Sequence, residues 1–142
     1  METANATAIT VATTVNAPIE KVWECWGQPE HITKWCQASD DWHAPYADND
    51  LRTGGSFKTT MAAKDGSFSF DFGGVYDEVR ENELISYTMS DGRSVRIVFT
   101  QGEDGVHIAE TFDPESTNPR EMQQAGWQAI LDNFRKYAEA NA

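Results

Sequence analysis

The apolar residues between Asn118 and Ala140 recur at the spacing of an α-helix. Asn118 is a suitable N-cap, Pro119 suits the first helical position, and Glu121 follows the cap as in a capping box. At 1.5 Å per residue this helix is roughly 30 Å long, so its apolar side needs a broad partner. The stripe at positions i, i+3, i+4, i+7 and i+11 consists of Trp127, Ile130, Leu131, Phe134 and Ala138, with Tyr137 at its edge.

Gly126 interrupts the middle of this expected helix. Glycine inside a helix costs about 1 kcal/mol relative to alanine, so its presence needs a reason. Two interpretations stay open. The commoner one is close packing of a strand against the bare helix backbone, and the other is that the missing side chain leaves room for a ligand.

Upstream of this helix the pattern alternates with a period of two, which is typical of strands with one buried face. Two short helical stretches near the N-terminus each begin at a proline. Short turns join consecutive strands, so the order β-αα-β-β-β-β-β-β-α predicts an α+β fold, a curved antiparallel sheet wrapped around the long C-terminal helix. The expected strands cover residues 9–15, about 41–45, 57–61, 68–80, 85–89, 95–99 and 106–112, and the expected helices cover residues 18–27, 29–35 and 118–140.

Three local features of these strands are expected from residue types. The polar stretch after Pro45 is expected to be a loop. The pair Gly73-Gly74 is expected to form a bulge or bend within a strand. Alternation with polar residues predicts an inner face of three phenylalanines, Phe68, Phe70 and Phe72.

Composition narrows the class of protein. The 142 residues fit one domain, 1–142, with residues 1–7 expected to be a flexible N-terminus. Eleven basic residues against 23 acidic ones give a net charge of −12, which argues against nucleic acid or anionic membranes as partners. No apolar run is long enough for a membrane span and no signal peptide is visible. We expect free thiols at Cys25 and Cys36 and a cytoplasmic location.

No arrangement of residues in the sequence demands catalysis, and no Cys/His cluster has metal-ligand spacing, so neither a metal nor a cofactor is expected. Of the three histidines, His43 beside Trp42 is the best placed to act in a site. An enzyme would need a titratable pair in a cavity, and the visible pair is Glu110 with His43 or with a tyrosine. We therefore assign no catalytic residue and keep Glu110 and His43 as the two candidates.

Glu110 shares the strand register of Val106, Ile108 and Phe112, so without a bulge it points inward. A lone carboxylate on an apolar face costs several kcal/mol unless it is paired or stays protonated. Three interpretations stay open: a bulge turns Glu110 outward, a structural partner pairs it, or it is a polar anchor inside a cavity.

The chain is rich in aromatic residues, with five Trp, four Tyr and seven Phe. Aromatic side chains in such number either fill a core or line a pocket, and both interpretations stay open here. If a cavity lies between the sheet and the long helix, the residues expected to line it are Trp35, Trp42, Phe57, Phe70, Tyr76, Tyr87, Phe99, Glu110, Trp127, Ile130 and Leu131.

Three stretches carry a family resemblance. The opening segment Ile9–Trp23 resembles the start of START-like (SRPBCC) helix-grip proteins. The segments Gly126–Phe134 and Asp50–Phe57, with the turn Gly74-Val75-Tyr76, are similar to bacterial homologues of the heat-shock protein 90 ATPase activator. The resemblance implies a long C-terminal helix held in a curved antiparallel sheet, with a cavity between them. It implies no fixed catalytic residues.

Within that superfamily, as the resemblance implies, members bind hydrophobic small molecules, some cyclise polyketides, and the eukaryotic relative regulates a chaperone. We therefore expect a non-catalytic protein that binds a small hydrophobic or amphipathic ligand in the cavity. The alternatives are a chaperone-linked stress-response regulator and a cavity enzyme of the polyketide cyclase type. A chaperone or a second copy of the chain is the expected protein partner if the protein has one.

Overall fold

The computed structural model of the protein describes residues 8–37 and 40–141, so the expected flexible N-terminus, residues 1–7, lies outside the described residues. The described elements follow the predicted order, and both N-terminal helices and the long C-terminal helix are present. They are β1 (Ile9–Val15), α2 (Ile19–Gly27), α3 (Pro29–Trp35), β2 (Trp42–Asn49), β3 (Ser56–Ala63), β4 (Ser69–Arg80), β5 (Leu84–Met89), β6 (Ser94–Gly102), β7 (Gly105–Phe112) and α4 (Arg120–Ala140).

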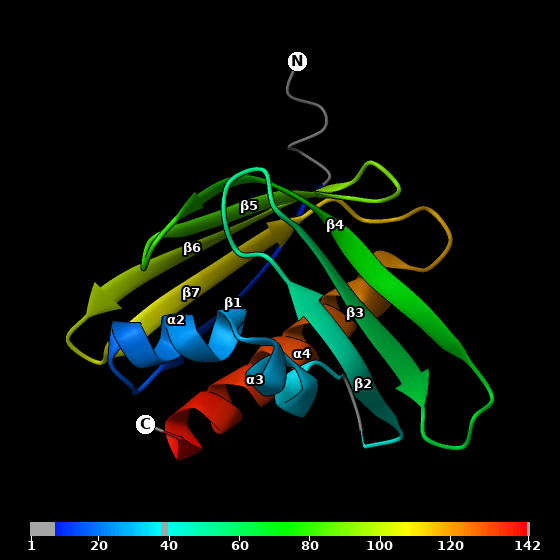
Figure 1. Ribbon diagram of the computed structural model, residues 1–142, viewed down its shortest axis with the longest axis horizontal. Helices are drawn as coiled ribbons and strands as arrows, with labels where there is room; N and C mark the ends of the chain where they lie inside the picture. The colour runs from blue at the N-terminus through cyan, green and yellow to red at the C-terminus, as the bar shows by residue number, and fades with distance from the viewer. Residues whose placement is uncertain (1–7, 38–39, 142) are drawn as a thin grey trace.

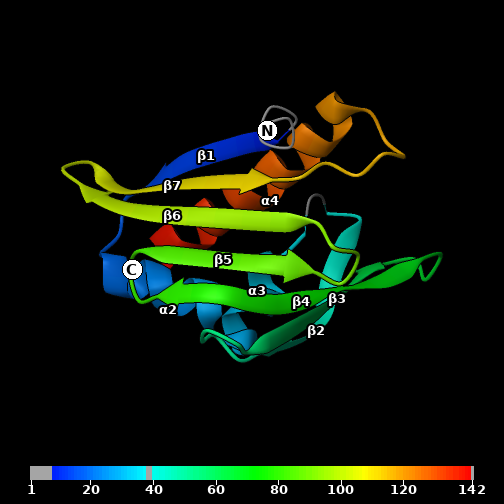
Figure 2. The ribbon, with the colours of Figure 1, turned by 90° about the horizontal axis from the view of Figure 1, so that it is seen from above.

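The seven strands form one antiparallel sheet in the order β1-β7-β6-β5-β4-β3-β2. Strands β2 to β7 are a meander, and β1 completes the sheet by pairing with β7, where Ile9 faces Phe112 and Val15 faces Val106. The sheet curves over α4, while α2 and α3 lie beside it on the same concave side (Figure 1). Viewed from above, the strands lie over the C-terminal part of α4, and its N-terminal end extends past β1 and β7 (Figure 2). The predicted α+β helix-grip architecture is confirmed.

The core lies between the concave face and the apolar stripe of α4. Leu131, Phe134 and Ala138 are fully buried, as the helical spacing predicts. The Phe134 ring contacts Trp26 of α2 and Trp35 of α3, at ring-centroid distances of 4.8 and 4.9 Å. Phe134 therefore joins all three helices beneath the sheet.

The predicted N-cap of the long helix is wrong by one position. Helix α4 begins at Arg120, and its N-cap is Pro119, whose ring has no acceptor for a backbone N–H. Asn118 is engaged elsewhere: its side-chain amide donates to Glu115 at 2.5 Å. Glu115 also accepts the backbone N–H groups of Thr117 and Asn118, at 2.6 and 2.8 Å. The carboxylate of Glu115 thus organises the loop that precedes the helix.

Two strand predictions are also wrong. Strand β2 continues past Pro45 to Asn49, where a loop was expected, because residues 46–49 pair with β3. The ladder is irregular between His43 and Tyr46, a stretch that includes Pro45, which has no N–H to donate. In β4 the ladder is regular at Gly73-Gly74, and the bulge lies three residues further on, between Tyr76 and Glu78. Glycine is required at position 74 by close packing and not by a bulge, because a Cβ there would lie 2.3 Å from the Thr88 carbonyl oxygen.

Phe70 and Phe72 lie on the inner face as expected, where both line the space between the sheet and α4, but Phe68 does not reach that space. Phe68 is 59% exposed and Phe70 42% exposed. The hairpin of β3 and β4 extends beyond the neighbouring strands (Figure 2), so its outer end has no helix beneath it. There the rings of Phe68 and Phe70 pack against Trp42, at 6.1 and 6.0 Å between centroids.

Candidate functional site

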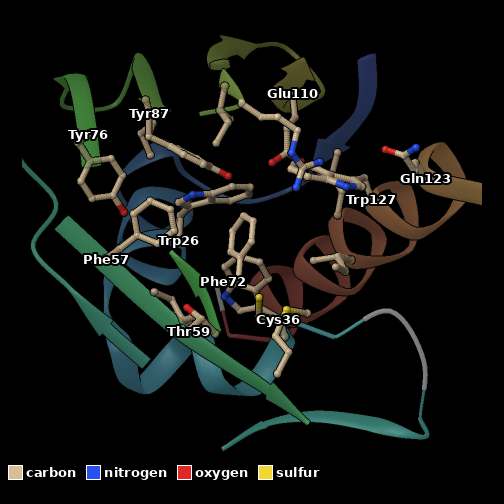
Figure 3. A pocket seen from close by; sticks show the side chains of 18 of the residues that line it. Trp26, Cys36, Phe57, Thr59, Phe72, Tyr76, Tyr87, Glu110, Gln123 and Trp127 are labelled. Atoms are coloured by element: carbon tan, nitrogen blue, oxygen red, sulfur yellow. The ribbon is translucent and has the colours of Figure 1, made fainter. Parts of the chain in front are cut away.

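A cavity of about 330 Å³ lies between the concave face of the sheet and helices α3 and α4. Ligand pockets in proteins begin at about this size. Its walls are mostly aromatic and aliphatic (Figure 3). Nine of the eleven residues expected from the sequence line it, namely Trp35, Phe57, Phe70, Tyr76, Tyr87, Glu110, Trp127, Ile130 and Leu131. The lining residues that the sequence analysis missed are Trp26, Ile32, Cys36, Thr59, Met61, Phe72, Ile85, Arg93, Ile97, Glu115 and Gln123.

Two expected residues do not reach this cavity. Phe99 lies further along β6, beneath α2, where its ring packs edge-on against Trp23 and Trp26 at 5.3 and 5.6 Å. Trp42 lies at the edge of the sheet and lines a neighbouring hollow instead. Strand alternation assigns each residue to a face, but the positions of α2 and α4 decide which part of that face is filled and which is empty.

The missed residues had partial signals in the sequence. Ile85 and Ile97 are apolar positions in the expected strands 85–89 and 95–99, and Ile32 is an apolar position in the expected helix 29–35. Phe72 was expected on the inner face of its strand. Arg93 and Gln123 carried no signal, because a turn residue and a polar residue near a helix start are normally solvated.

Aromatic rings form one end of the cavity. Phe57 of β3 packs against Tyr76 and Tyr87, with centroid separations of 5.1 and 4.8 Å. The Tyr76 hydroxyl donates to Asn49, whose amide donates to the Gly27 carbonyl at 2.7 Å. This chain of hydrogen bonds ties β4 to β2 and α2, and it leaves the Tyr76 hydroxyl occupied.

The opposite end is formed by Trp127 and by polar side chains that include Glu110 and Gln123 (Figure 3). Trp127 of α4 stacks on Phe112 of β7, with ring centroids 3.8 Å apart and planes 7° from parallel. Gln123 donates to the Glu115 carbonyl at 3.0 Å, and Arg93 pairs with Asp91 at 2.8 Å. These polar side chains therefore already have partners.

Glu110 projects from β7 into the cavity and is only 7% exposed. The β7 register is continuous against both neighbours, with Glu110 opposite Val11 and Ile97, so no bulge turns it outward. Among the described residues, none makes a hydrogen bond or an ion pair with its carboxyl group. Burial without a partner raises the pKa of Glu110 to about 8, because a charged carboxylate is poorly solvated there.

The Glu110 carboxyl affects the pKa values of two neighbouring side chains, Tyr87 and Cys36. Burial, and then the Glu110 carboxyl, raises the pKa of the Tyr87 hydroxyl well above its usual value. The same two causes raise the pKa of the Cys36 thiol to about 12. Cys25 and Cys36 are both free, as expected. Near neutral pH, all three groups facing this part of the cavity are therefore uncharged.

The predicted partnership of Glu110 with His43 does not occur. His43 is exposed on β2 and lines neither the cavity nor the hollow beside it. Tyr87 is the tyrosine that does lie near Glu110. No group of three or more His, Cys, Asp or Glu side chains within residues 8–37 and 40–141 is placed to hold a metal ion.

A second hollow of about 320 Å³, the outer groove, adjoins the cavity along the N-terminal half of α4. Four residues line the groove alone, Trp42, Asn118, Met122 and Gly126, and five line both hollows, Met61, Phe70, Gln123, Trp127 and Ile130. A Cβ at Gly126 would meet no atom within 4 Å. The interpretation of Gly126 as a close-packing residue is therefore wrong, and its missing side chain widens the groove.

The substitution Gly126→Ala is expected to raise the free energy of unfolding by about 0.5–1 kcal/mol, because alanine favours a helix and the added methyl group meets open space. Urea denaturation measures the change. Gly74→Ala is the matched control with the opposite sign, since its methyl group would collide with the Thr88 carbonyl. A loss of stability in Gly126→Ala would contradict the open groove.

Residues 16–139 match the family model described as Activator of Hsp90 ATPase homolog 1-like protein. The chain belongs to this family. The matched range includes Glu110 and every residue that lines the cavity. This AHSA1-like chain contains, among its described helices, none that is long and apolar enough to cross a membrane.

Solved structures agree with the assignment. An AHSA1-like protein from Aeromonas hydrophila is 43% identical, with a TM-score of 0.88 over 94% of this chain and 93% of its own. Chr148 from Cytophaga hutchinsonii is 63% identical, with a TM-score of 0.78 over 95% and 92%. CV1439 from Chromobacterium violaceum shares the fold at 24% identity, with a TM-score of 0.84 over 93% and 97%. No protein of curated function matches the chain.

Proposed function

We propose that this AHSA1-like protein binds a small hydrophobic or amphipathic ligand in the cavity between the sheet and α4, without catalysing a reaction. The observation that carries the proposal is the cavity itself: about 330 Å³ lined mostly by aromatic and aliphatic side chains. Close packing normally removes voids larger than a water molecule from protein interiors. An apolar space about ten times that size is typical of a binding site.

The residues that line the cavity support binding over catalysis. Acid–base sites commonly combine two groups whose environments push their pKa values apart. His43 does not line the cavity, and burial keeps the Tyr87 and Cys36 side chains protonated. Glu115, the ionised carboxylate in the lining, already accepts the backbone N–H groups of Thr117 and Asn118. The family name also suggests a chaperone as a partner, but no feature of the described surface favours that function over ligand binding.

The test uses N-phenylnaphthylamine, an uncharged dye whose emission rises in apolar surroundings. We expect binding at micromolar affinity or weaker, and Trp127→Ala is expected to change the emission gain because Trp127 lines the cavity. Val98→Ala, on the outer face of β6, is the control and should leave the gain unchanged. No gain with the folded protein at high concentration would contradict the proposed function.

A further inference from the structure

Tyr87 and Glu110 face the same part of the cavity without a hydrogen-bond partner among the described residues, and the buried Thr59 hydroxyl, on the opposite wall, is a third such group. The Tyr87 side chain is only 6% exposed and the Glu110 side chain only 7%. Within the described residues, neither the Tyr87 hydroxyl nor the Glu110 carboxyl makes a hydrogen bond. Buried polar groups in proteins are nearly always hydrogen-bonded, and the Tyr76 hydroxyl nearby is an example. Two groups without a protein partner that face the same space are therefore free to hydrogen-bond a ligand.

The two groups come from strands on either side of β6 and converge. Figure 3 shows the Tyr87 hydroxyl and the Glu110 carboxyl directed toward one another above the cavity. Their proximity is also evident in the pKa of Tyr87, to which the Glu110 carboxyl contributes after burial. One ligand atom placed between them would meet both groups.

Both groups are hydrogen-bond donors in the folded protein. A carboxyl group that stays protonated in an apolar site donates its O–H, and a tyrosine hydroxyl beside it does the same. Cys36 adds a weak thiol donor to the same part of the cavity. Two strong donors aimed at one place match an oxygen atom with two lone pairs, such as a carbonyl oxygen.

The rest of the cavity limits the charge of the ligand. An ionised carboxylate or phosphate would lose its hydration among aromatic walls, which is costly without a cationic partner. Arg93, the one basic residue in the lining, pairs with Asp91 at 2.8 Å and so is already neutralised. The protein as a whole carries a net charge of −12. An uncharged ligand fits these conditions.

We propose that Glu110 and Tyr87 form a two-donor site for the carbonyl oxygen of an uncharged, largely aromatic or alicyclic ligand, whose apolar body lies against Phe57, Phe72 and Trp127. This inference rests on the proposed function and specifies the ligand class. It makes Glu110 a specificity-determining residue for binding and gives it no part in a reaction.

The test compares two probes of nearly the same shape, naphthyl methyl ketone and ethylnaphthalene, by calorimetric titration at neutral pH. The ketone is expected to bind more tightly. Tyr87→Phe and Glu110→Leu should each weaken ketone binding by roughly three- to tenfold, the effect of one lost hydrogen bond, and leave ethylnaphthalene binding unchanged. Thr59→Val is the control, because its hydroxyl lies on the opposite wall of the cavity (Figure 3). Naphthoate, the anionic analogue, should bind more weakly than the ketone.

Two further measurements report the hydrogen bonds directly. Infrared spectra should show the carbonyl stretch of the bound ketone at lower frequency in the wild type than in Tyr87→Phe or Glu110→Leu. Glu110→Gln keeps a donor and should retain the preference for the ketone. Wild-type affinity for the ketone should fall as pH rises through about 8, whereas the affinity of Glu110→Gln should not change. The other titratable groups near Glu110 keep their charge state through this range, since burial holds Tyr87 and Cys36 protonated and hydrogen bonds from Asn118 keep Glu115 ionised.

The outcomes separate the two proposals. If neither ketone nor hydrocarbon binds to the folded protein, the proposed function fails and this inference fails with it. If both probes bind equally well, or if Tyr87→Phe and Glu110→Leu weaken both to the same extent, the cavity binds ligands but the two-donor site does not exist. Equal affinity for naphthoate and the ketone would overturn the restriction to uncharged ligands.

Discussion

Phe134→Ala is expected to lower the free energy of unfolding by about 3–5 kcal/mol, which is a large part of the 5–15 kcal/mol typical of a domain. The Phe134 side chain is fully buried, and its ring contacts Trp26 and Trp35 at 4.8 and 4.9 Å between centroids. Truncation removes these contacts and leaves a cavity at the point where α4 meets α2 and α3. Because the site is enclosed on all sides, the structure can collapse only partly into the space.

Urea denaturation followed by far-ultraviolet circular dichroism measures this loss. Phe68→Ala is the matched control: it removes the same atoms from a ring that is 59% exposed at the end of the β3–β4 hairpin. Its effect should be much smaller than that of Phe134→Ala. Equal denaturation midpoints for Phe134→Ala and the wild type would contradict the packing of α4 against the helices and the sheet.

The stability of the wild type relative to Glu110→Gln is expected to fall as pH rises from about 4.5 to about 8. Burial raises the pKa of Glu110 from 4.5 to about 8 in the folded protein. Between these values the folded state holds a proton that the unfolded state has released, so each pH unit disfavours folding by about 1.4 kcal/mol. Between these two pH values, the difference in free energy of unfolding between the wild type and Glu110→Gln should change by on the order of 3–5 kcal/mol.

Below and above this pH range, the difference in free energy of unfolding between the wild type and Glu110→Gln should be constant. Below about 4.5 the carboxyl is protonated in both states, so its contribution to stability is fully present, and above about 8 it is ionised in both and the contribution has been lost. Urea denaturation of both proteins at a series of pH values gives the two curves. Glu103→Gln, in the exposed turn between β6 and β7, should follow the wild-type curve. Parallel curves for wild type and Glu110→Gln would show that Glu110 is solvated in the folded protein.

The order and type of the elements could be predicted from the sequence because they depend on local periodicity. A stripe repeating every three to four residues can bury its apolar side only as a helix, and Leu131 and Phe134 are buried as that rule requires. Alternation in β5, β6 and β7 likewise selects one face, and it placed Glu110 on the inner face correctly. The predictions failed at residues whose type suits more than one kind of structure. Proline often ends a strand, but Pro45 lies at an irregular point within β2. Asparagine often caps a helix, but Asn118 donates to Glu115.

The boundary between packed core and cavity could be decided only by the tertiary structure. Phe99 and Tyr87 have the same pattern in the sequence, yet α2 covers Phe99 while Tyr87 faces the cavity. The state of Glu110 also depends on residues distant in sequence, since burial beneath the elements packed around it raises its pKa. Local periodicity therefore determined which side chains point inward, and the packing of three helices against the curved sheet decided which of them enclose an empty space.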